Sequence, residues 1–247
     1  MTTFAHAMAN NFFHFKRFSV FQDRCAMKVG TDGTLLGAWA NGGKQILDIG
    51  TGTGLIALMM AQRFPNSHFT AIDCDLDTCL QAADNVSASP FANQIDVINT
   101  SLQSFHSHSA ESQSTDGLLH GPFDAIVCNP PFFENALQSP CGQRTTARHT
   151  VSLSYSELFR GVDRLLGEEG EFSAIIPFDC RQRFEEEAAL RGFFSSRVCA
   201  VSTTPQKAPR RFLLAFRRSP VAKVENLRLV IGEDLYRTLL QDFLIHF

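Results

Sequence analysis

The stretch LDIGTGTGLIAL, residues 47–58, places Gly50, Gly52 and Gly54 between a short apolar run and a segment with helical periodicity. Glycine permits the tight turn that joins a strand to a helix, and it lets a ligand approach the backbone closely. The N-terminus of the following helix offers free N–H groups to a polar ligand. A purely structural turn would use the same glycines, so the turn alone leaves both interpretations open.

Two aspartates next to this turn favour the interpretation as a cofactor site. Asp48 lies two residues before Gly50, and Asp73 ends the next apolar run in AIDCD, residues 71–75. An acidic residue about 20 residues beyond such a turn is where the two hydroxyls of a ribose find an acceptor. The spacing G-x-G-x-G differs from the G-x-G-x-x-G of dinucleotide-binding turns. The combination predicts a cofactor of the adenosyl type.

From residue 44 onward, short apolar runs alternate with segments of helical period. This alternation predicts a parallel sheet with helices on both faces and right-handed crossovers. Strands are expected at residues 44–50, 68–75, 94–101, 123–129 and 170–177, and helices at 55–64, 78–89, 154–166 and 179–192.

The last two apolar runs break the alternation. Residues 195–204 and 210–219 are joined by only PQKAP, which is too short for a crossover helix. They are therefore expected to form an antiparallel hairpin at one edge of an otherwise parallel sheet.

The remaining segments are expected to be appendages of this one domain. Residues 106–121 are polar and rich in serine, which predicts an exposed loop without a core of its own. Residues 1–43 precede the first strand and are expected to pack over the carboxyl edge of the sheet. Residues 232–247 have helical periodicity and predict a C-terminal helix.

The overall composition sets limits on partners and location. The chain has 247 residues and a net charge of −3, so any nucleic-acid contact must come from local basic patches. Seven cysteines with no C-x-x-C pair indicate reduced thiols in a cytoplasmic protein and predict no metal site. The longest apolar run, residues 55–61, is far too short to span a membrane. No obligate protein partner is inferred.

The motifs together resemble a known class of enzymes. The D-x-G-x-G-x-G turn, the acidic end of the second strand and Asn-Pro-Pro-Phe at 129–132 are similar to the class I S-adenosylmethionine-dependent methyltransferases that methylate amino groups. The resemblance implies a Rossmann-like α/β fold with a seven-stranded, mostly parallel sheet that ends in an antiparallel hairpin.

The same resemblance implies roles for individual residues. The three glycines would line the methionine and ribose portion of S-adenosylmethionine, with Asp48 nearby and Asp73 on the ribose hydroxyls. Ser101 stands where many members carry an aspartate that accepts from the adenine amine. Asn129 would face both the cofactor and the amine that receives the methyl group, which leaves S-adenosylhomocysteine as the product.

The expected catalytic chemistry depends on four consecutive residues, Asn129, Pro130, Pro131 and Phe132. An exocyclic amine is a poor nucleophile because its lone pair is delocalised into the ring. Two acceptors, the Asn129 side-chain oxygen and the Pro130 carbonyl, would draw the amine toward tetrahedral geometry, and the prolines would hold both acceptors fixed. Phe132 offers a face on which the planar group can stack. The alternative is a strand end stiffened by proline.

Longer stretches of the sequence narrow the choice of substrate. Residues 21–39, FQDRCAMKVGTDGTLLGAW, and 144–159, RTTARHTVSLSYSELF, resemble the bacterial tRNA1(Val) adenine-N6 methyltransferase family, and PRRFLLAF at 209–216 fits as well. That family modifies the adenosine directly 3′ of the anticodon. By this resemblance, Thr31 and Asp32 are candidate cofactor contacts, although the segment 29–33 could equally be a turn that caps the glycine loop.

A tRNA partner requires basic residues around the carboxyl edge, where a base from an RNA loop can be splayed out and stacked. Each candidate could also be an ordinary solvated charge. The candidates are Lys16, Arg17, Arg144, Arg148, His149, Lys207, Arg210 and Arg211.

Other substrates and a different function stay open. The same four-residue motif serves adenine in DNA or rRNA and the glutamine amide of release factors. The glutamine enzymes normally carry an N-terminal helical domain, for which segment 1–43 is too short. The DNA enzymes usually carry a target-recognition insertion, for which segment 106–121 is too short and too acidic. A domain that only binds nucleotide is a further alternative, and it would have no use for paired amine acceptors at 129–130.

Overall fold

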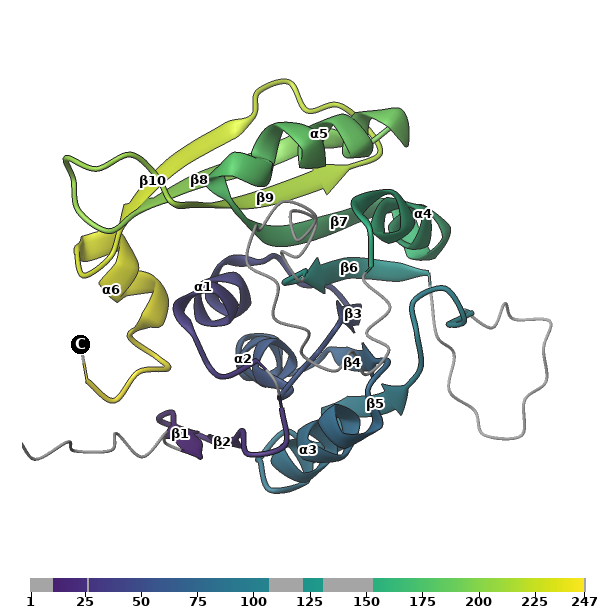
Figure 1. The fold of residues 1–247 in the computed structure, drawn as a ribbon, viewed down its shortest axis with the longest axis vertical. Helices are drawn as coiled ribbons and strands as arrows, with labels where there is room; N and C mark the ends of the chain where they lie inside the picture. Colours follow the sequence, from purple (N-terminus) through teal and green to yellow (C-terminus); the bar gives the residue numbers. More distant parts are fainter. Residues whose placement is uncertain (1–10, 26, 107–121, 131–152, 247) are drawn as a thin grey trace, which may run out of the picture.

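An eight-stranded sheet runs through the computed structural model, which describes residues 11–25, 27–106, 122–130 and 153–246 (Figure 1). The strands stand in the order β10-β8-β9-β7-β6-β3-β4-β5. Their bounds are β3 Gln45–Ile49, β4 His68–Asp73, β5 Ile95–Asn99, β6 Phe123–Cys128, β7 Leu166–Pro177, β8 Phe194–Ser202, β9 Arg211–Arg217 and β10 Glu225–Val230.

The parallel part of the sheet places a switch point between β3 and β6. Strand β3 pairs in parallel with β4 on one side and with β6 on the other. The chain builds outward through β4 and β5, then returns to the other side of β3 with β6 and β7. Ligands of open α/β sheets bind outside the carboxyl ends of the strands at such a point. The fold therefore directs attention to the ends of β3 and β6.

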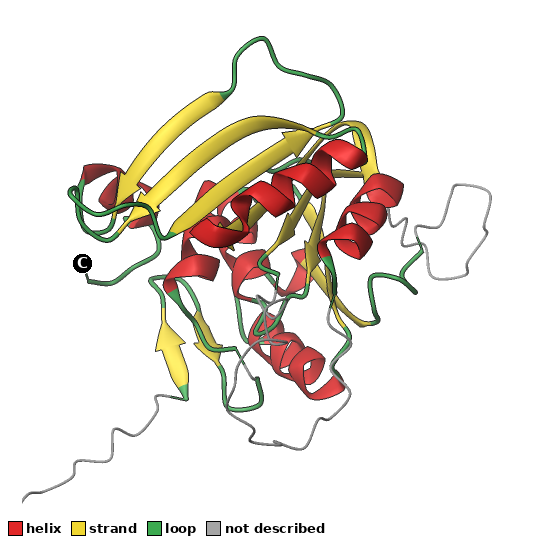
Figure 2. Cartoon of the chain, turned by 45° about the horizontal axis from the view of Figure 1, so that its top comes forward, coloured by secondary structure: helices red, strands yellow, loops and turns green. Residues whose placement is uncertain are grey.

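Helices cover both faces of the sheet, as Figure 2 shows. One hydrophobic core contains Leu36, Leu58 and Leu240 from α1, α2 and α6, together with Val86 of α3. The other contains Phe159 and Phe184 from α4 and α5. The bounds are α1 Thr31–Trp39, α2 Leu55–Arg63, α3 Leu76–Ser87, α4 Tyr155–Leu165, α5 Arg181–Leu190 and α6 Asp234–Leu240, with short 3-10 turns η1 Ala92–Gln94 and η3 Phe178–Cys180.

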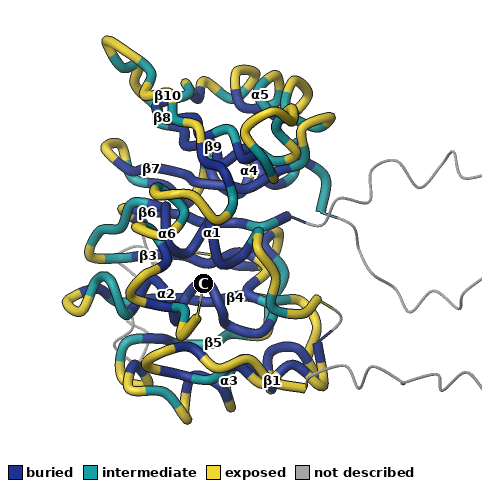
Figure 3. Tube along the Cα trace, turned by 90° about the vertical axis from the view of Figure 1, so that its left-hand side faces the viewer, coloured by how far each residue is buried: buried dark blue, intermediate teal, exposed yellow. Residues whose placement is uncertain are grey.

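Residues before the first sheet strand form two elements. Strands β1, Phe12–His14, and β2, Ser19–Phe21, pair as an antiparallel ribbon next to α3 (Figure 3). Helix α1 packs against α2 and against β7 and β9 of the sheet. This segment therefore contributes a helix to the central layers and does not lie only over the carboxyl edge.

The predicted α/β architecture is confirmed, and all seven predicted strands are present. The structure adds β10, which pairs in parallel with β8, so the β8–β9 hairpin lies inside the sheet and the prediction of an edge hairpin was wrong. Strand β7 begins at Leu166, four residues before the predicted start. The C-terminal helix is shorter than predicted, because α6 covers only Asp234–Leu240. The predicted loop 106–121 lies outside the described residues, apart from His106.

Candidate active site

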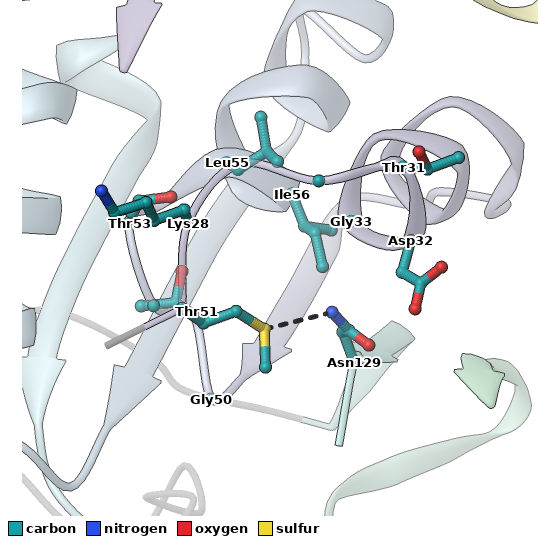
Figure 4. Close-up of a pocket in the computed structure, with 13 residues that line it drawn as sticks. Lys28, Thr31, Asp32, Gly33, Gly50, Thr51, Thr53, Leu55, Ile56 and Asn129 are labelled. Carbon is teal, nitrogen blue, oxygen red and sulfur yellow. Dashed lines mark hydrogen bonds between the residues drawn. The ribbon is translucent and has the colours of Figure 1, made fainter. Parts of the chain in front are cut away.

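A pocket of about 390 Å³ opens beside the carboxyl ends of β3 and β6 (Figure 4). Three segments meet there: the loop and helix start before α1, the glycine turn, and the first residue after β6. The lining residues are Met27, Lys28, Gly30, Thr31, Asp32, Gly33, Gly50, Thr51, Gly52, Thr53, Leu55, Ile56 and Asn129.

The glycine turn adopts a backbone that favours glycine at three positions. Gly50, Gly52 and Gly54 have φ angles of +68°, +58° and +81°. The N–H groups of Gly50 and Thr51 donate to the carbonyl of Ile72, at 2.9 and 3.0 Å, which fixes the turn to β4. A Cβ atom at Gly50 or Gly52 would meet no atom within 4 Å. The turn thus presents bare backbone to open space, as a cofactor cradle requires.

Asp73 ends β4 and supports the turn from behind. Its Oδ2 accepts the N–H of Gly52 at 3.0 Å, and its Oδ1 accepts the N–H of Asp75 at 3.1 Å. Each carboxylate oxygen has a second lone pair, so both keep capacity for a ligand hydroxyl. The side chain is only partly buried. This arrangement suits a group that holds two neighbouring hydroxyls.

Asp48 lies under the turn and is fully buried. Its Oδ2 accepts the hydroxyl of Thr51 at 2.7 Å, whereas its Oδ1 has no hydrogen-bond partner. Burial raises the pKa of this carboxyl group to about 7, because removal of water disfavours the charged form. A carboxyl group with one free oxygen is thereby held directly beneath the cofactor cradle.

Asn129 follows β6 and faces the pocket between the glycine turn and the start of α1 (Figure 4). Its Nδ2 donates to the thioether sulfur of Met27 at 3.6 Å. Its Oδ1 is buried and accepts no hydrogen bond from the described residues. A buried amide oxygen without a donor is costly, and such a group calls for a partner. An amine that enters the pocket would supply one.

Asp32 connects the pocket to the far hairpin of the sheet. Its Oδ2 accepts from Nε of Arg211 at 2.8 Å. Arg211 begins β9 and pairs with Pro177 at the carboxyl end of β7. The start of β9 therefore lies at the same edge of the sheet as the pocket.

The structure brings most of the described cofactor candidates together. Thr31, Asp32, Gly50, Gly52 and Asn129 line the pocket, while Gly54 completes the turn. Asp48, Asp73 and Ser101 are not among the lining residues. The hydroxyl of Ser101 bonds Ser104 and caps its own turn, at 3.0 Å to Oγ and 3.2 Å to the N–H. Pro130 is buried next to Asn129. Five candidates lie outside the described residues: Pro131, Phe132, Arg144, Arg148 and His149.

The described basic candidates divide into two groups. Lys207 and Arg210 are exposed in the connection from β8 to β9, at the carboxyl edge beside Arg211. Lys16 and Arg17 instead line a second cavity with Arg63, at the C-terminal end of α2. The glycine turn lies at the other end of this nine-residue helix, about 13 Å away. The expectation that Lys16 and Arg17 surround the carboxyl edge is therefore wrong.

Sequence reasoning missed several residues that shape the pocket. Met27 and Lys28 line it, and the thioether contact of Met27 has no signature in a single sequence. Asn85 is fully buried in α3, where it donates to the carbonyl of Thr53 at 2.9 Å and to that of Phe21 at 2.8 Å. A polar residue on the apolar face beside Ala82 and Val86 was the available signal.

The residues present fit S-adenosylmethionine. The open glycine backbone and the partly exposed carboxylate of Asp73 provide a cradle and acceptors for hydroxyl groups. The volume of the pocket is in the range of small-molecule sites. Among the described residues, no cluster of three or more His, Cys, Asp or Glu could hold a metal ion, and no helix is long and apolar enough to cross a membrane.

Solved structures of methyltransferases share this fold. A predicted O-methyltransferase from Agrobacterium tumefaciens is 17% identical, with a TM-score of 0.57 over 82% of this chain and 88% of its own. TYW2 from P. horikoshii in complex with MeSAdo is 12% identical, with a TM-score of 0.53 over 82% of this chain and 68% of its own. The fold is therefore that of the class I methyltransferases.

Sequence comparisons specify the family. The methyltransferase small domain family matches residues 29–176. The tRNA1(Val) (adenine(37)-N6)-methyltransferase of Parabacteroides distasonis is 44% identical over 93% of each chain, and that of Trichodesmium erythraeum is 38% identical over 97% of this chain and all of its own. The chain belongs to the family of tRNA1(Val) (adenine(37)-N6)-methyltransferases. The predicted family, enzyme class and dependence on S-adenosylmethionine are confirmed.

Proposed function

We propose that the protein methylates N6 of adenosine 37 in tRNA1(Val), the activity that the names of its relatives print. The observation that carries the proposal is the Asn129 amide. Its buried oxygen lacks a donor among the described residues, and its side chain lines the same pocket as the glycine turn. An adenine amine with two N–H groups is a fitting partner for that oxygen.

When bound, S-adenosylmethionine supplies a methyl group on a positively charged sulfur. The glycine turn would hold the cofactor through its backbone, and Asp73 would hold the ribose hydroxyls. Gly50 and Gly52 leave room for this because a Cβ atom there would point into open space. Asp48, which is fully buried under the turn, would support the cradle through the hydrogen bond that it accepts from the Thr51 hydroxyl.

The proposed catalytic role of Asn129 depends on its amide oxygen and on the carbonyl of the next residue. Its Oδ1 and the carbonyl of Pro130 would each accept one N–H of the target amine, which concentrates the lone pair on the nitrogen. Both groups are held by the end of β6, so little reorganisation is needed as charge develops. Attack by the neutral amine would first give a methylated ammonium, which is strongly acidic and would lose one proton to water without a dedicated general base.

Recognition of an RNA loop fits the surroundings of the pocket. Bases in RNA loops can be extruded without opening a duplex. Lys28 lies at the pocket, and Lys207 and Arg210 are exposed at the same edge of the sheet. These cations would contact phosphates and contribute affinity without reading sequence.

The proposal is tested with methyl-labelled S-adenosylmethionine and total bacterial tRNA. Nuclease digestion should yield labelled N6-methyladenosine, and mapping should place it at position 37 of tRNA1(Val). A transcript of the same tRNA with guanosine at position 37 is the matched control and should remain unlabelled. Label in DNA, in rRNA or in a protein glutamine, with none in tRNA, would refute the proposal.

A further inference from the structure

The ribbon of β1 and β2 exposes aromatic rings where a two-stranded ribbon would ordinarily expose polar side chains. In the β1–β2 register, Phe12 stands opposite Phe21 and His14 stands opposite Ser19, so these four side chains share one face. Val20 belongs to the other face and is fully buried in the core. Phe12 and Phe21 are 44% and 45% exposed. The buried face thus accounts for folding, and the aromatic face remains unexplained by it.

The exposed rings form one continuous surface, which we call the aromatic ribbon and define as Phe12, His14 and Phe21. The ring centroids of Phe12 and His14 are 4.7 Å apart, and those of Phe12 and Phe21 are 6.1 Å apart. His14 is held by a 2.7 Å hydrogen bond between Nδ1 and the hydroxyl of Ser19. Three neighbouring planar groups on one side of a ribbon offer faces and edges for further stacking.

A single buried side chain ties the aromatic ribbon to the pocket. The Oδ1 of Asn85 accepts the N–H of Phe21 at 2.9 Å, and its Nδ2 donates to the carbonyls of Phe21 and Thr53. Thr53 lines the pocket. The Phe21 end of the ribbon is therefore separated from the glycine turn by no more than the width of one asparagine.

The chain after β2 also leads directly to the pocket. The Oε1 of Gln22 accepts the N–H of Val29 at 2.7 Å, which closes the loop between them. Met27 and Lys28 lie within this loop and line the pocket. The Phe21 end of the aromatic ribbon thus lies close to the pocket.

We propose that the aromatic ribbon stacks an unpaired base of the RNA substrate next to the adenosine that enters the pocket. This inference rests on the proposed function. When one base leaves a stack, its neighbours lose a stacking partner, and an aromatic surface beside the pocket replaces it. Aromatic side chains on a strand surface are a common means of holding single-stranded RNA. Lys28, between ribbon and pocket, adds a positive charge for the connecting phosphate.

The test measures binding of a fluorescent anticodon stem-loop of tRNA1(Val) by anisotropy. Replacement of both rings, Phe12→Ala with Phe21→Ala, should raise the RNA Kd about 10- to 100-fold, the loss expected when a base loses its stacking partner. The Kd for S-adenosylmethionine should stay unchanged. The matched control is Phe194→Ala, because Phe194 is 46% exposed at the start of β8, at the opposite edge of the sheet. This control should bind RNA like the wild type.

A second pair of variants separates stacking from general packing. Phe21→Tyr keeps a ring and should keep RNA affinity, whereas Phe21→Leu keeps an apolar side chain and should lose it. Equal affinities of these two variants, or wild-type affinity of the double alanine variant, would overturn the inference and leave the ribbon to another partner. Failure of the wild-type enzyme to methylate tRNA would instead overturn the proposed function.

Discussion

At the scale of single residues, the catalytic amide is oriented by a methionine. A thioether sulfur accepts hydrogen bonds only weakly and donates none, so Met27 can face the NH₂ end of Asn129 but not its oxygen. The contact thereby holds the amide with its NH₂ end toward Met27 and with Oδ1 on the opposite side. Met27 itself is 48% exposed, so packing of the core does not explain its place.

Replacement of Met27 tests this orientation. Met27→Leu keeps the size of the side chain but removes the acceptor, and we expect kcat to fall roughly tenfold, as for loss of one weak bond to a charged or reacting group. Met27→Gln restores an acceptor and should restore kcat. Calorimetry should give the same Kd for S-adenosylmethionine in all three proteins. Met60→Leu makes the same change at a buried position in α2 and is the control for packing. Equal kcat values for Met27→Leu and the wild type would contradict the role of Met27 in orienting Asn129.

The buried Asp48 predicts a pH dependence of stability. Its pKa is about 7 in the folded protein, because burial disfavours the charged form, against about 3.9 in an unfolded chain. At pH values between these two pKa values, Asp48 is protonated in the folded protein and ionised in the unfolded chain. The free energy of unfolding therefore falls as pH rises from about 4 to 7. Asp48→Asn removes this titrating group. The free energy of unfolding, measured by urea titration without cofactor, should therefore change less with pH in the variant. Parallel profiles for variant and wild type would refute the raised pKa.

Residue chemistry made part of the site predictable. Glycine adopts the positive φ angles of the turn most readily, and a carboxylate at the end of β4 has one oxygen for each of two hydroxyls, so these positions favour few residue types. The contact of Met27 with Asn129 and the bridge through Asn85 join positions that are far apart in the sequence. No local pattern encodes such contacts, because many side chains could stand there.

At the scale of elements, the glycine turn must satisfy both backbone strain and ligand access. Gly52→Ala places a methyl group at a φ of +58° and toward the pocket, so we expect weaker binding of S-adenosylmethionine as well as lower stability. Gly192→Ala is a matched control, because Gly192 has a φ of +73° and open space at Cβ but follows α5, away from the pocket. Each change costs about 1–2 kcal/mol of strain. Calorimetry should show weaker cofactor binding for Gly52→Ala alone.

Element boundaries followed from periodicity where apolar runs were long. Strand β6 and helix α4 lie within one residue of their expected bounds, because a buried parallel strand and an amphipathic helix each have a strong pattern. Strand β10 was missed although Leu227 and Leu229 alternate with Asn226 and Arg228. Its six residues have one exposed face, and their pairing with β8 depends on contacts about 28 residues apart.

At the scale of the whole molecule, the carboxyl edge unites the pocket with the connection between β8 and β9, and the Phe21 end of the aromatic ribbon lies close to the pocket. The ion pair of Asp32 with Arg211 links the pocket to that connection. Lys16 and Arg17 lie at the other end of α2, in the turn between β1 and β2. A pattern of charges along the chain does not reveal this division, which only the fold creates.

The division of basic residues between the two edges of the sheet predicts which lysines contact RNA. Lys207→Glu reverses a charge at the carboxyl edge, so we expect the RNA Kd to rise and the salt dependence of binding to weaken by about one phosphate contact. Lys223→Glu makes the same change in the connection from β9 to β10, at the opposite edge, and should bind RNA normally. Anisotropy titrations across a range of salt concentrations measure both. If both substitutions raised the RNA Kd equally, binding would respond to net charge alone, and the prediction for the carboxyl edge would be wrong.

The most direct test of the account compares two properties of Asn129→Ala. Removal of the amide oxygen should lower the rate of methyl transfer to tRNA1(Val) by about 100- to 1000-fold, the usual loss when a preorganised group at the reacting centre is deleted. Binding of S-adenosylmethionine, measured by calorimetry, should change by no more than about twofold, because loss of a hydrogen bond to the cofactor would cost about 0.5–1.5 kcal/mol, or roughly 2- to 13-fold in Kd. A variant that loses cofactor binding and methyl transfer in equal measure, or that methylates at the wild-type rate, would contradict the role of Asn129 as the acceptor for the substrate amine.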